Sequence, residues 1–215
     1  MVVTLEELSE EQMVKVLTEP NHLKFGAGAR RRQWHRNVVA IGLSGGFMEP
    51  LESTSIHLIQ RAVIRLLRMM PLARVSDRDR AEFNDQQMQD MEQIRDFLIL
   101  HYHVTDRRDS PFWRRCASMP IPDTLRQKIE LFRETGRVFR RNEELFAENS
   151  WVQVMMGQGI TPRSWHPVAA KLRDDELARF LSGIREDVAN TVARLPRHAD
   201  YVAHHCGAAA PARAA

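Results

Sequence analysis

The stretch that decides the fold is Asn37-Val38-Val39-Ala40-Ile41-Gly42-Leu43-Ser44-Gly45-Gly46-Phe47-Met48-Glu49-Pro50-Leu51-Glu52-Ser53-Thr54. Its first seven residues form a continuous apolar run with β-branched members, which predicts a short buried strand. Ser44, Gly45 and Gly46 break this run, and the segment from Glu49 onward is typical of a turn that leads into a helix. Apolar residues then recur at helical spacing until Pro71, which predicts an amphipathic helix.

The rest of the chain has mostly helical periodicity. Ser76 with Asp79 forms a capping box, and Gly136 is placed to close a later helix. The predicted helices cover residues 4–17, 56–70, 76–102, 123–136, 150–156 and 174–195, with an Ala-rich frayed tail at the end. The side chains expected on buried helix faces are Phe83, Met91, Ile94, Leu98, Leu125, Ile129 and Phe132.

A single apolar strand among helices cannot satisfy its own backbone groups. Either the strand pairs with something outside this chain, or it is an extended piece that lies against helices. The first interpretation indicates a truncated domain. It also predicts an exposed apolar face around Val38 to Leu43 in the isolated chain.

The composition is that of an ordinary globular protein. The chain has 215 residues, of which 43% are hydrophobic and 27% charged, and its formal net charge is only +3. Two cysteines without a Cys-x-x-Cys pair argue against a disulfide framework and a thiolate zinc site. We find no signal peptide pattern and no apolar run of membrane-spanning length, so we expect a cytoplasmic protein without a membrane partner.

The first turn of the helix after Glu52 is a candidate anion site. A helix begins with unpaired N–H groups and partial positive charge, so Ser53, Thr54 and Ser55 could hold an anion. Gly45 and Gly46 would let a ligand approach the backbone closely. On spacing alone, the plainer interpretation of Ser53 or Thr54 as a helix N-cap is favoured.

The stretch from Asn37 to Thr54 resembles the signature of the flavin-dependent tryptophan halogenases. Weaker similarity continues through His101-Tyr102-His103, Asp109-Ser110-Pro111-Phe112-Trp113-Arg114, Ser150-Trp151 and Gly157-Gln158-Gly159-Ile160, so that it covers roughly residues 20 to 205. The resemblance implies the C-terminal, helical substrate half of an α/β fold akin to FAD-dependent monooxygenases. The expected fold class is thus mostly α with one or a few short strands.

The resemblance also implies an activity. In that family reduced FAD and O₂ oxidise chloride or bromide, and the hypohalous species formed reaches a lysine beside an electron-rich aromatic substrate. Glu52 would be the carboxylate that orients the electrophile or removes the ring proton. Thr54 and Ser55 would offer backbone N–H groups to the halide, whereas Leu43, Ser53 and Ile56 would contact the flavin. A flavin reductase would supply the reduced cofactor.

Several parts of that family's pattern are missing from this sequence. It contains no Gly-x-Gly-x-x-Gly fingerprint for the ADP part of FAD, no two-tryptophan tunnel motif and no lysine in the matching context. Residues 139–146 lack the tyrosines and the Phe-Trp pair of the enzymes that act on free tryptophan, so a different indole or a phenol is favoured. The isolated chain is expected to have little or no halogenase activity.

The expected organisation is one truncated domain. It comprises an irregular segment 1–36, a strand–turn–helix segment 37–58 for flavin and halide, a helical substrate module 59–205 and a tail 206–215. The alternative function is a catalytically inactive remnant or interaction module that needs a flavin-binding partner chain or a second copy of itself.

Other features support other functions more weakly. Arg30, Arg31, Arg32 and Arg36 could bind nucleic acid, but a solvated edge is favoured and no nucleic acid is expected. The histidines His57, His101 and His103 lack acidic or thiol partners at ligand spacing, so no metal is expected. Trp113, Trp151 and Trp165 could line a ring-binding pocket or belong to the core.

Overall fold

The computed structural model describes residues 26–70 and 74–207. The helix expected over residues 4–17 and most of the Ala-rich tail lie outside the described residues. Contacts divide the chain into two compact units, one comprising residues 1–130 and 138–161 and the other residues 131–137 and 162–215. The single-domain organisation expected from the sequence stays a prediction.

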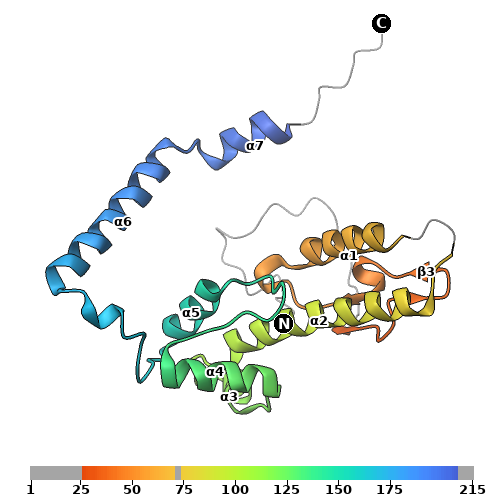
Figure 1. Ribbon diagram of the computed structural model, residues 1–215, viewed down its shortest axis with the longest axis horizontal. Helices are drawn as coiled ribbons and strands as arrows, with labels where there is room; N and C mark the ends of the chain where they lie inside the picture. Colours follow the sequence, from red (N-terminus) through yellow and green to blue (C-terminus); the bar gives the residue numbers. More distant parts are fainter. Residues whose placement is uncertain (1–25, 71–73, 208–215) are drawn as a thin grey trace, which may run out of the picture. The chain divides into compact units, whose positions relative to one another are not determined.

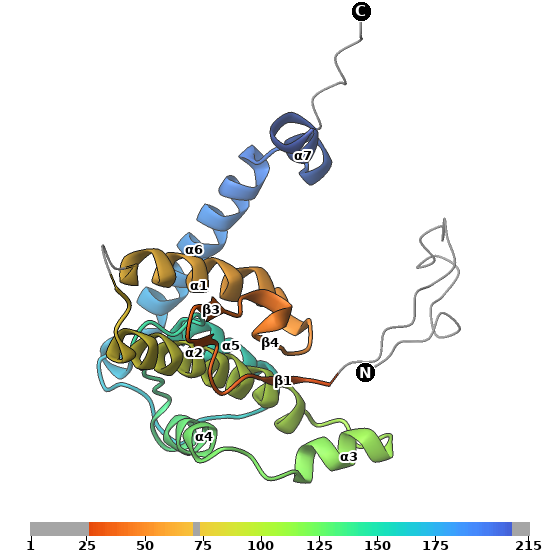
Figure 2. The ribbon, with the colours of Figure 1, turned by 90° about the vertical axis from the view of Figure 1, so that its right-hand side faces the viewer.

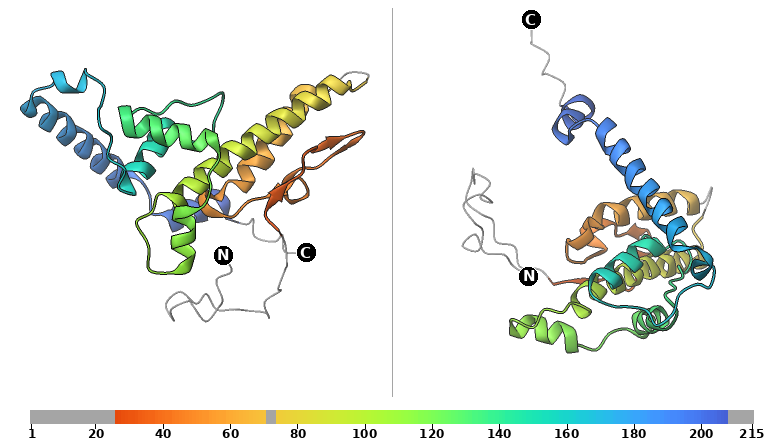
Figure 3. Two further views of the ribbon diagram at one scale, coloured as in Figure 1. Left: turned by 90° about the horizontal axis from the view of Figure 1, so that it is seen from below. Right: turned by 90° about the vertical axis from the view of Figure 1, so that its left-hand side faces the viewer.

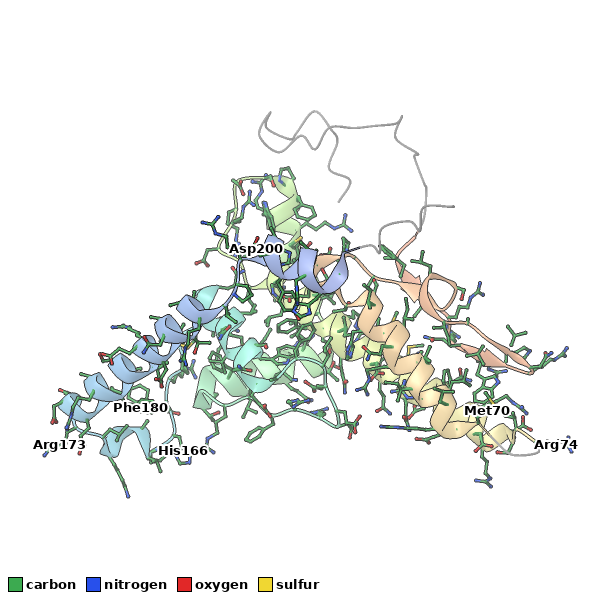
Figure 4. All side chains as sticks on the ribbon, turned by 90° about the horizontal axis from the view of Figure 1, so that it is seen from above. Met70, Arg74, His166, Arg173, Phe180 and Asp200 are labelled. Carbon is green, nitrogen blue, oxygen red and sulfur yellow. The ribbon has the colours of Figure 1, made fainter. Side chains whose placement is uncertain are left out.

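The first unit is built around two long helices. α1 (Ser55–Met69) and α2 (Asp77–His103) lie side by side, as the first three figures show from different directions (Figures 1, 2 and 3). Figure 4 marks Met70 and Arg74, which flank the undescribed residues between these helices. Ser76 begins α2 with the predicted capping box, in which its side chain and that of Asp79 bond each other's backbone N–H.

The predicted apolar strand is wrong in its extent and in its lack of a partner. Only Val38–Val39 is strand (β3), and it pairs antiparallel with β2 (Trp34–His35) of the same chain. The hairpin turns at Arg36, whose φ of 54° is left-handed. A second antiparallel pair joins β1 (Gly28–Ala29) to β4 (Gly46–Phe47), with a 3-10 turn, η3 (Gly42–Ser44), between them.

The hairpin lies against α1 and α2 through its tryptophan. Trp34 is buried and meets Phe83 of α2 edge to face, with the ring centroids 5.4 Å apart. The Asn84 side chain exchanges two hydrogen bonds with the Trp34 backbone, of 2.7 and 2.9 Å. The hairpin residues Val39 and Ile41 pack on the same cluster, whereas Val38 and Leu43 are exposed. The extended-piece interpretation therefore describes this segment best.

A glycine is required where β4 pairs with β1. A Cβ at Gly46 would lie 2.7 Å from the carbonyl oxygen of Gly28 and 3.0 Å from Cε of Met91. Because backbone atoms provide the closest contact, any side chain here would push β1 and β4 apart. Gly46 thus lets β1 and β4 pair closely beside Met91 of α2.

Three further helices complete the first unit. They are α3 (Pro111–Ser118), α4 (Asp123–Thr135), whose last turn belongs to the second unit, and α5 (Glu148–Gly157). The core here contains Phe97, which stacks on Phe146 and meets Trp151 edge to face, with centroids 3.8 and 4.8 Å away. All seven side chains predicted to be buried are buried, and Gly136 ends α4 with a φ of 66°.

The second unit holds η5 (Ala169–Lys171), α6 (Asp174–Arg194) and α7 (His198–Cys206). The expected helix over 174–195 is confirmed. Its apolar stripe is exposed, and Phe180, which Figure 4 labels, is 62% accessible. The mostly helical fold class with a few short strands is confirmed.

Candidate functional site

The turn before α1 has an unusual backbone. Glu52 has φ 66° and Ser53 φ 51°, which are left-handed values that residues other than glycine rarely adopt. Both residues belong to the short 3-10 turn η4 (Leu51–Ser53), in which Ser53 N–H donates to the Pro50 carbonyl over 2.8 Å. Such conformations cost of order 1–3 kcal/mol each and persist only where surrounding contacts enforce them. The contacts that enforce this one come from α2.

Two successive residues near the end of α2 hold the turn. His101 Nε2 lies 3.1 Å from Glu52 Oε1, and the Tyr102 hydroxyl donates to Glu49 Oε1 over 2.6 Å. Burial and, next, the hydrogen bond with Glu49 raise the pKa of Tyr102 well above its ordinary value. The Tyr102 ring also stacks on Trp113, with centroids 6.0 Å apart. The turn that carries Glu52 is therefore in contact with α2 at two points, Glu49 and Glu52.

The N-terminus of α1 follows directly. Thr54 is the N-cap residue of α1, as the plainer interpretation expects, but its side chain is buried and makes no cap hydrogen bond. The first backbone bond of the helix runs from Leu58 N–H to the Thr54 carbonyl, over 3.0 Å. The preceding N–H groups, of Ser55, Ile56 and His57, have no helical acceptor, which is the usual condition of a first turn. They give this end of α1 an affinity for negative charge.

A small cavity of about 50 Å³ adjoins this helix end. The residues that line it lie in the glycine turn, at the start of α1, on α2 and next to the short strands: Gln33, Gly42, Leu43, Gly45, Gly46, Met48, Thr54, Ser55, Leu58, Ile59, Gln87 and Met91. A space of this size admits a monatomic ion or a water molecule but not an isoalloxazine ring. The cavity therefore fits the halide half of the prediction better than the flavin half.

The structure brings together some of the predicted site residues. Leu43, Thr54 and Ser55 line the same cavity. Glu52, Ser53 and Ile56 are outside its lining, and both Leu43 and Ile56 are 77% exposed.

Sequence reasoning missed a buried polar relay that ends at the cavity. Arg65 of α1 donates to the Gln87 side-chain oxygen, and Gln87 Nε2 donates to Gln33 Oε1 over 3.1 Å. Arg65 also pairs with Asp90 at 2.8 Å, which keeps the buried guanidinium compensated. No local pattern links these residues, because they come from the hairpin and two helices.

His57 is the third residue of α1. Its Nε2 is buried and has no hydrogen-bond partner among the described residues. Burial, followed by the charge of Arg61, lowers the pKa of His57, while Asp90 acts in the opposite direction. Burial and the charge of Arg61 thus both favour the neutral form of His57.

A second acidic residue, Glu144, is paired far more fully. Lys128 Nζ lies 2.7 and 3.1 Å from its two oxygens and 4.0 Å above the ring of Trp151. The Arg141 backbone N–H also donates to Glu144, over 3.0 Å. This pair borders a cavity of about 410 Å³ between α2, α4 and residues 141–144. Trp151 is 1% exposed and also lines this cavity, so both interpretations of it hold, whereas Trp165 is 63% exposed.

The remaining candidates contribute little to the site. The described members of the arginine cluster are exposed, and Arg30 Nε donates to the Ser44 carbonyl over 2.6 Å. In the described ranges no three His, Cys, Asp or Glu side chains gather as metal ligands would. None of the helices in those ranges is long and apolar enough to cross a membrane.

Comparison with known proteins adds a family to this geometry. The family model described as tryptophan halogenase matches residues 3–174. A 7-chloro-L-tryptophan 6-halogenase from Kutzneria is 34% identical, over 88% of this chain and 37% of its own length. The chain spans between 32% and 37% of the length of that protein and of tryptophan 6-halogenases from two Streptomyces species.

Solved structures agree with this result. A flavin-dependent halogenase from Xanthomonas campestris superimposes with a TM-score of 0.86 at 55% identity, covering 94% of this chain and 41% of that one. A flavin-dependent halogenase from Brevundimonas gives a TM-score of 0.80 at 44% identity, covering 87% of this chain and 38% of its own.

Proposed function

The chain belongs to the tryptophan halogenase family, and from this premise we propose that it supplies the halide- and base-bearing part of a flavin-dependent halogenase. The proposed reaction is chlorination or bromination of an electron-rich aromatic ring of the indole type. One observation carries the proposal: a carboxylate on a left-handed turn immediately precedes a helix N-terminus that opens on an ion-sized cavity.

Each part of this site has a chemical task. The N–H groups at the start of α1 and the cavity beside Thr54 and Ser55 suit a chloride or bromide ion. The Glu52 side chain is 37% exposed and contacts His101 through Oε1, so its second oxygen can reach a substrate. As the carbon–halogen bond forms, the oxygen–halogen bond of the hypohalous acid breaks and hydroxide leaves. The ring carbon then loses its proton to Glu52, and that proton converts the hydroxide to water. General-base help of this kind contributes about 10² to 10⁴ in rate.

FAD would supply the oxidation of the halide when it is bound. Leu43 and Ile56 have exposed apolar side chains, and Ser53, which is also exposed, offers a hydroxyl. These residues fit one edge of a flavin ring, whereas no described segment has the glycine fingerprint that would hold the ADP part. We therefore propose that a separate segment or chain binds most of the cofactor, which a flavin reductase keeps reduced.

The proposal is tested by reconstitution. The purified chain is titrated with FAD alone and together with a separately expressed flavin domain, and each mixture then receives reduced FAD, O₂, bromide and indole. Brominated indole that forms only with both proteins supports the proposal. Absence of flavin binding and of product in a complex that demonstrably assembles contradicts it.

The apolar surface supports a second candidate, a non-catalytic module that binds a flavin-containing partner. Leu43, Ile56, Val63 and Leu67 are all at least 41% exposed and lie on or beside α1. A surface of this kind usually marks an interaction site. Partner binding is common to both functions, and the effect of a Glu52 variant on turnover distinguishes them.

A further inference from the structure

Helix α6 carries a continuous apolar stripe that no other described residue covers. Large apolar residues recur every three or four positions, so that they share one face of the helix. The stripe comprises Leu177, Phe180, Leu181, Ile184, Val188, Val192 and Leu195, each of which is at least 41% exposed. Positions 177 to 195 span about 27 Å of helix. An exposed apolar surface of this length usually marks an interaction site.

Local signals specify the helix itself. Its first turn holds three acidic residues, 174–176, whose charge suits a helix N-terminus, and Arg179 pairs with Asp175 at 3.1 Å. Pro196 then prevents the helix from continuing. An isolated helix is nevertheless marginal in water, because most helical stability in proteins comes from the packing of an amphipathic face. The surface that stabilises α6 therefore lies outside the described residues.

We propose that the stripe of α6 docks into an apolar groove of the polypeptide that binds most of the FAD. This inference rests on the proposed function, which requires a separate flavin-binding segment or chain. The Xanthomonas flavin-dependent halogenase matches 94% of this chain with only 41% of its own, so more than half of that protein has no counterpart here. Insertion of apolar anchors at helical spacing into a groove is a common way for a helix to bind. Because α6 belongs to the second unit, this attachment is separate from the exposed residues of α1.

The charges beside the stripe argue against a second copy of this chain as the occupant. In a two-fold pair, the residues at the middle of the interface meet their own copies. Midway along the stripe, helical geometry places Arg185 on one side and Asp187 on the other. An antiparallel pair of α6 helices would therefore bring Arg185 near Arg185 and Asp187 near Asp187, and a parallel pair would set every charge opposite its own copy. Juxtaposed like charges disfavour such a pairing.

Hydrogen–deuterium exchange tests the proposal without requiring halogenation. Exchange of the α6 amides is compared between the isolated 215-residue chain and a chimera in which this chain replaces the matching part of the Xanthomonas halogenase. An undocked helix opens readily, so these amides should exchange fast in the isolated chain and more than about tenfold slower in the chimera. Equally fast exchange in both proteins would overturn the proposal. So would slow exchange in the isolated chain, and slowing that increases with its concentration would identify a second copy as the occupant.

Two matched variants give a second measurement, cosedimentation of the chain with a separately expressed flavin domain. Ile184→Asp places a charge in the middle of the stripe and should abolish cosedimentation. Ala189→Asp places the same charge on the opposite face of α6 and should leave it unchanged. Equal binding by the two variants would contradict docking through the stripe.

The proposed function fails separately from this inference. A chimera with protected α6 amides that forms no brominated indole would leave the docking intact and remove the proposed activity. Brominated indole from a chimera whose α6 amides stay unprotected would do the reverse.

Discussion

Glu52 and Glu144 each face a basic side chain, but they differ in burial and in how their oxygens are used. Glu144 is 4% exposed, and Lys128 contacts both of its oxygens. Glu52 is 37% exposed and gives one oxygen to His101. Glu144 joins residues 141–144 to α4 within the core, whereas Glu52 stands on a left-handed turn beside an ion-sized cavity.

The difference separates a structural carboxylate from a candidate catalytic one. A buried ion pair must have nearly all of its groups bonded, because an uncompensated charge in the interior is costly. A base must instead keep one lone pair free and reachable by a substrate. By these criteria Glu144 has no capacity left for chemistry, whereas Glu52 retains Oε2.

The largest expected effect is on turnover. Glu52→Gln should reduce halogenation in the reconstituted system by about 10² to 10⁴ because the amide cannot take the ring proton. Product formation per mole of complex measures this loss, and circular dichroism should show an unchanged helix content. Undiminished turnover would make Glu52 as structural as Glu144.

The next largest effect is on stability and comes from Glu144. Glu144→Ala should lower the free energy of unfolding by about 3–5 kcal/mol, because Lys128 is left as a buried charge without a partner. Thermal unfolding measures the change. The control is Glu143→Ala, whose side chain is 79% exposed and which should cost no more than about 0.5 kcal/mol. Equal losses of unfolding free energy in Glu144→Ala and Glu143→Ala would contradict the structural role given to Glu144.

A smaller effect is expected at the other attachment of the Glu52 turn. Tyr102→Phe removes the donor to Glu49 and keeps the stacking on Trp113, so it should cost about 1–2 kcal/mol. Denaturant unfolding gives the value. If Tyr102→Phe left the free energy of unfolding unchanged, the turn would be held through His101 alone.

The same tyrosine predicts a pH dependence. The pKa of Tyr102 is raised in the folded chain, so above its ordinary value of 10.0 the unfolded chain loses this proton first. Stability should then fall as pH rises beyond 10, and the Phe variant lacks this contribution. The difference in free energy of unfolding between the parent chain and Tyr102→Phe should therefore become smaller as the pH rises above 10, as denaturation curves at alkaline pH would measure. A difference that grows with pH would be inconsistent with a raised pKa of Tyr102.

Helices and their ends could be predicted because their signals are local. The capping box at Ser76 and the left-handed glycine at Gly136 each depend on neighbours within four residues, and both are present as expected. The start of α1 after Thr54 was likewise predictable, since the apolar spacing begins there. The family resemblance rested on the same continuous stretch and is confirmed by the family match.

The hairpin and the partners of Glu52 could not be predicted in the same way. In the apolar run, Val39 and Ile41 face the core and Val38 faces solvent, an alternation that the continuous apolar sequence from Val38 to Leu43 conceals. His101 lies 49 positions after Glu52 and has no pattern of its own, because their pairing depends on how α2 packs beside the turn.

The most direct test of the proposed function is a chimera in which this chain replaces the matching part of the Xanthomonas halogenase, to which it is 55% identical. The folded, flavin-loaded chimera is given bromide, O₂, reduced FAD and indole, and products are identified by mass spectrometry. We predict brominated indole that disappears with Glu52→Gln. A chimera that binds flavin but yields no product, or one whose product survives that substitution, would contradict the proposal that this chain carries the halide site and the base.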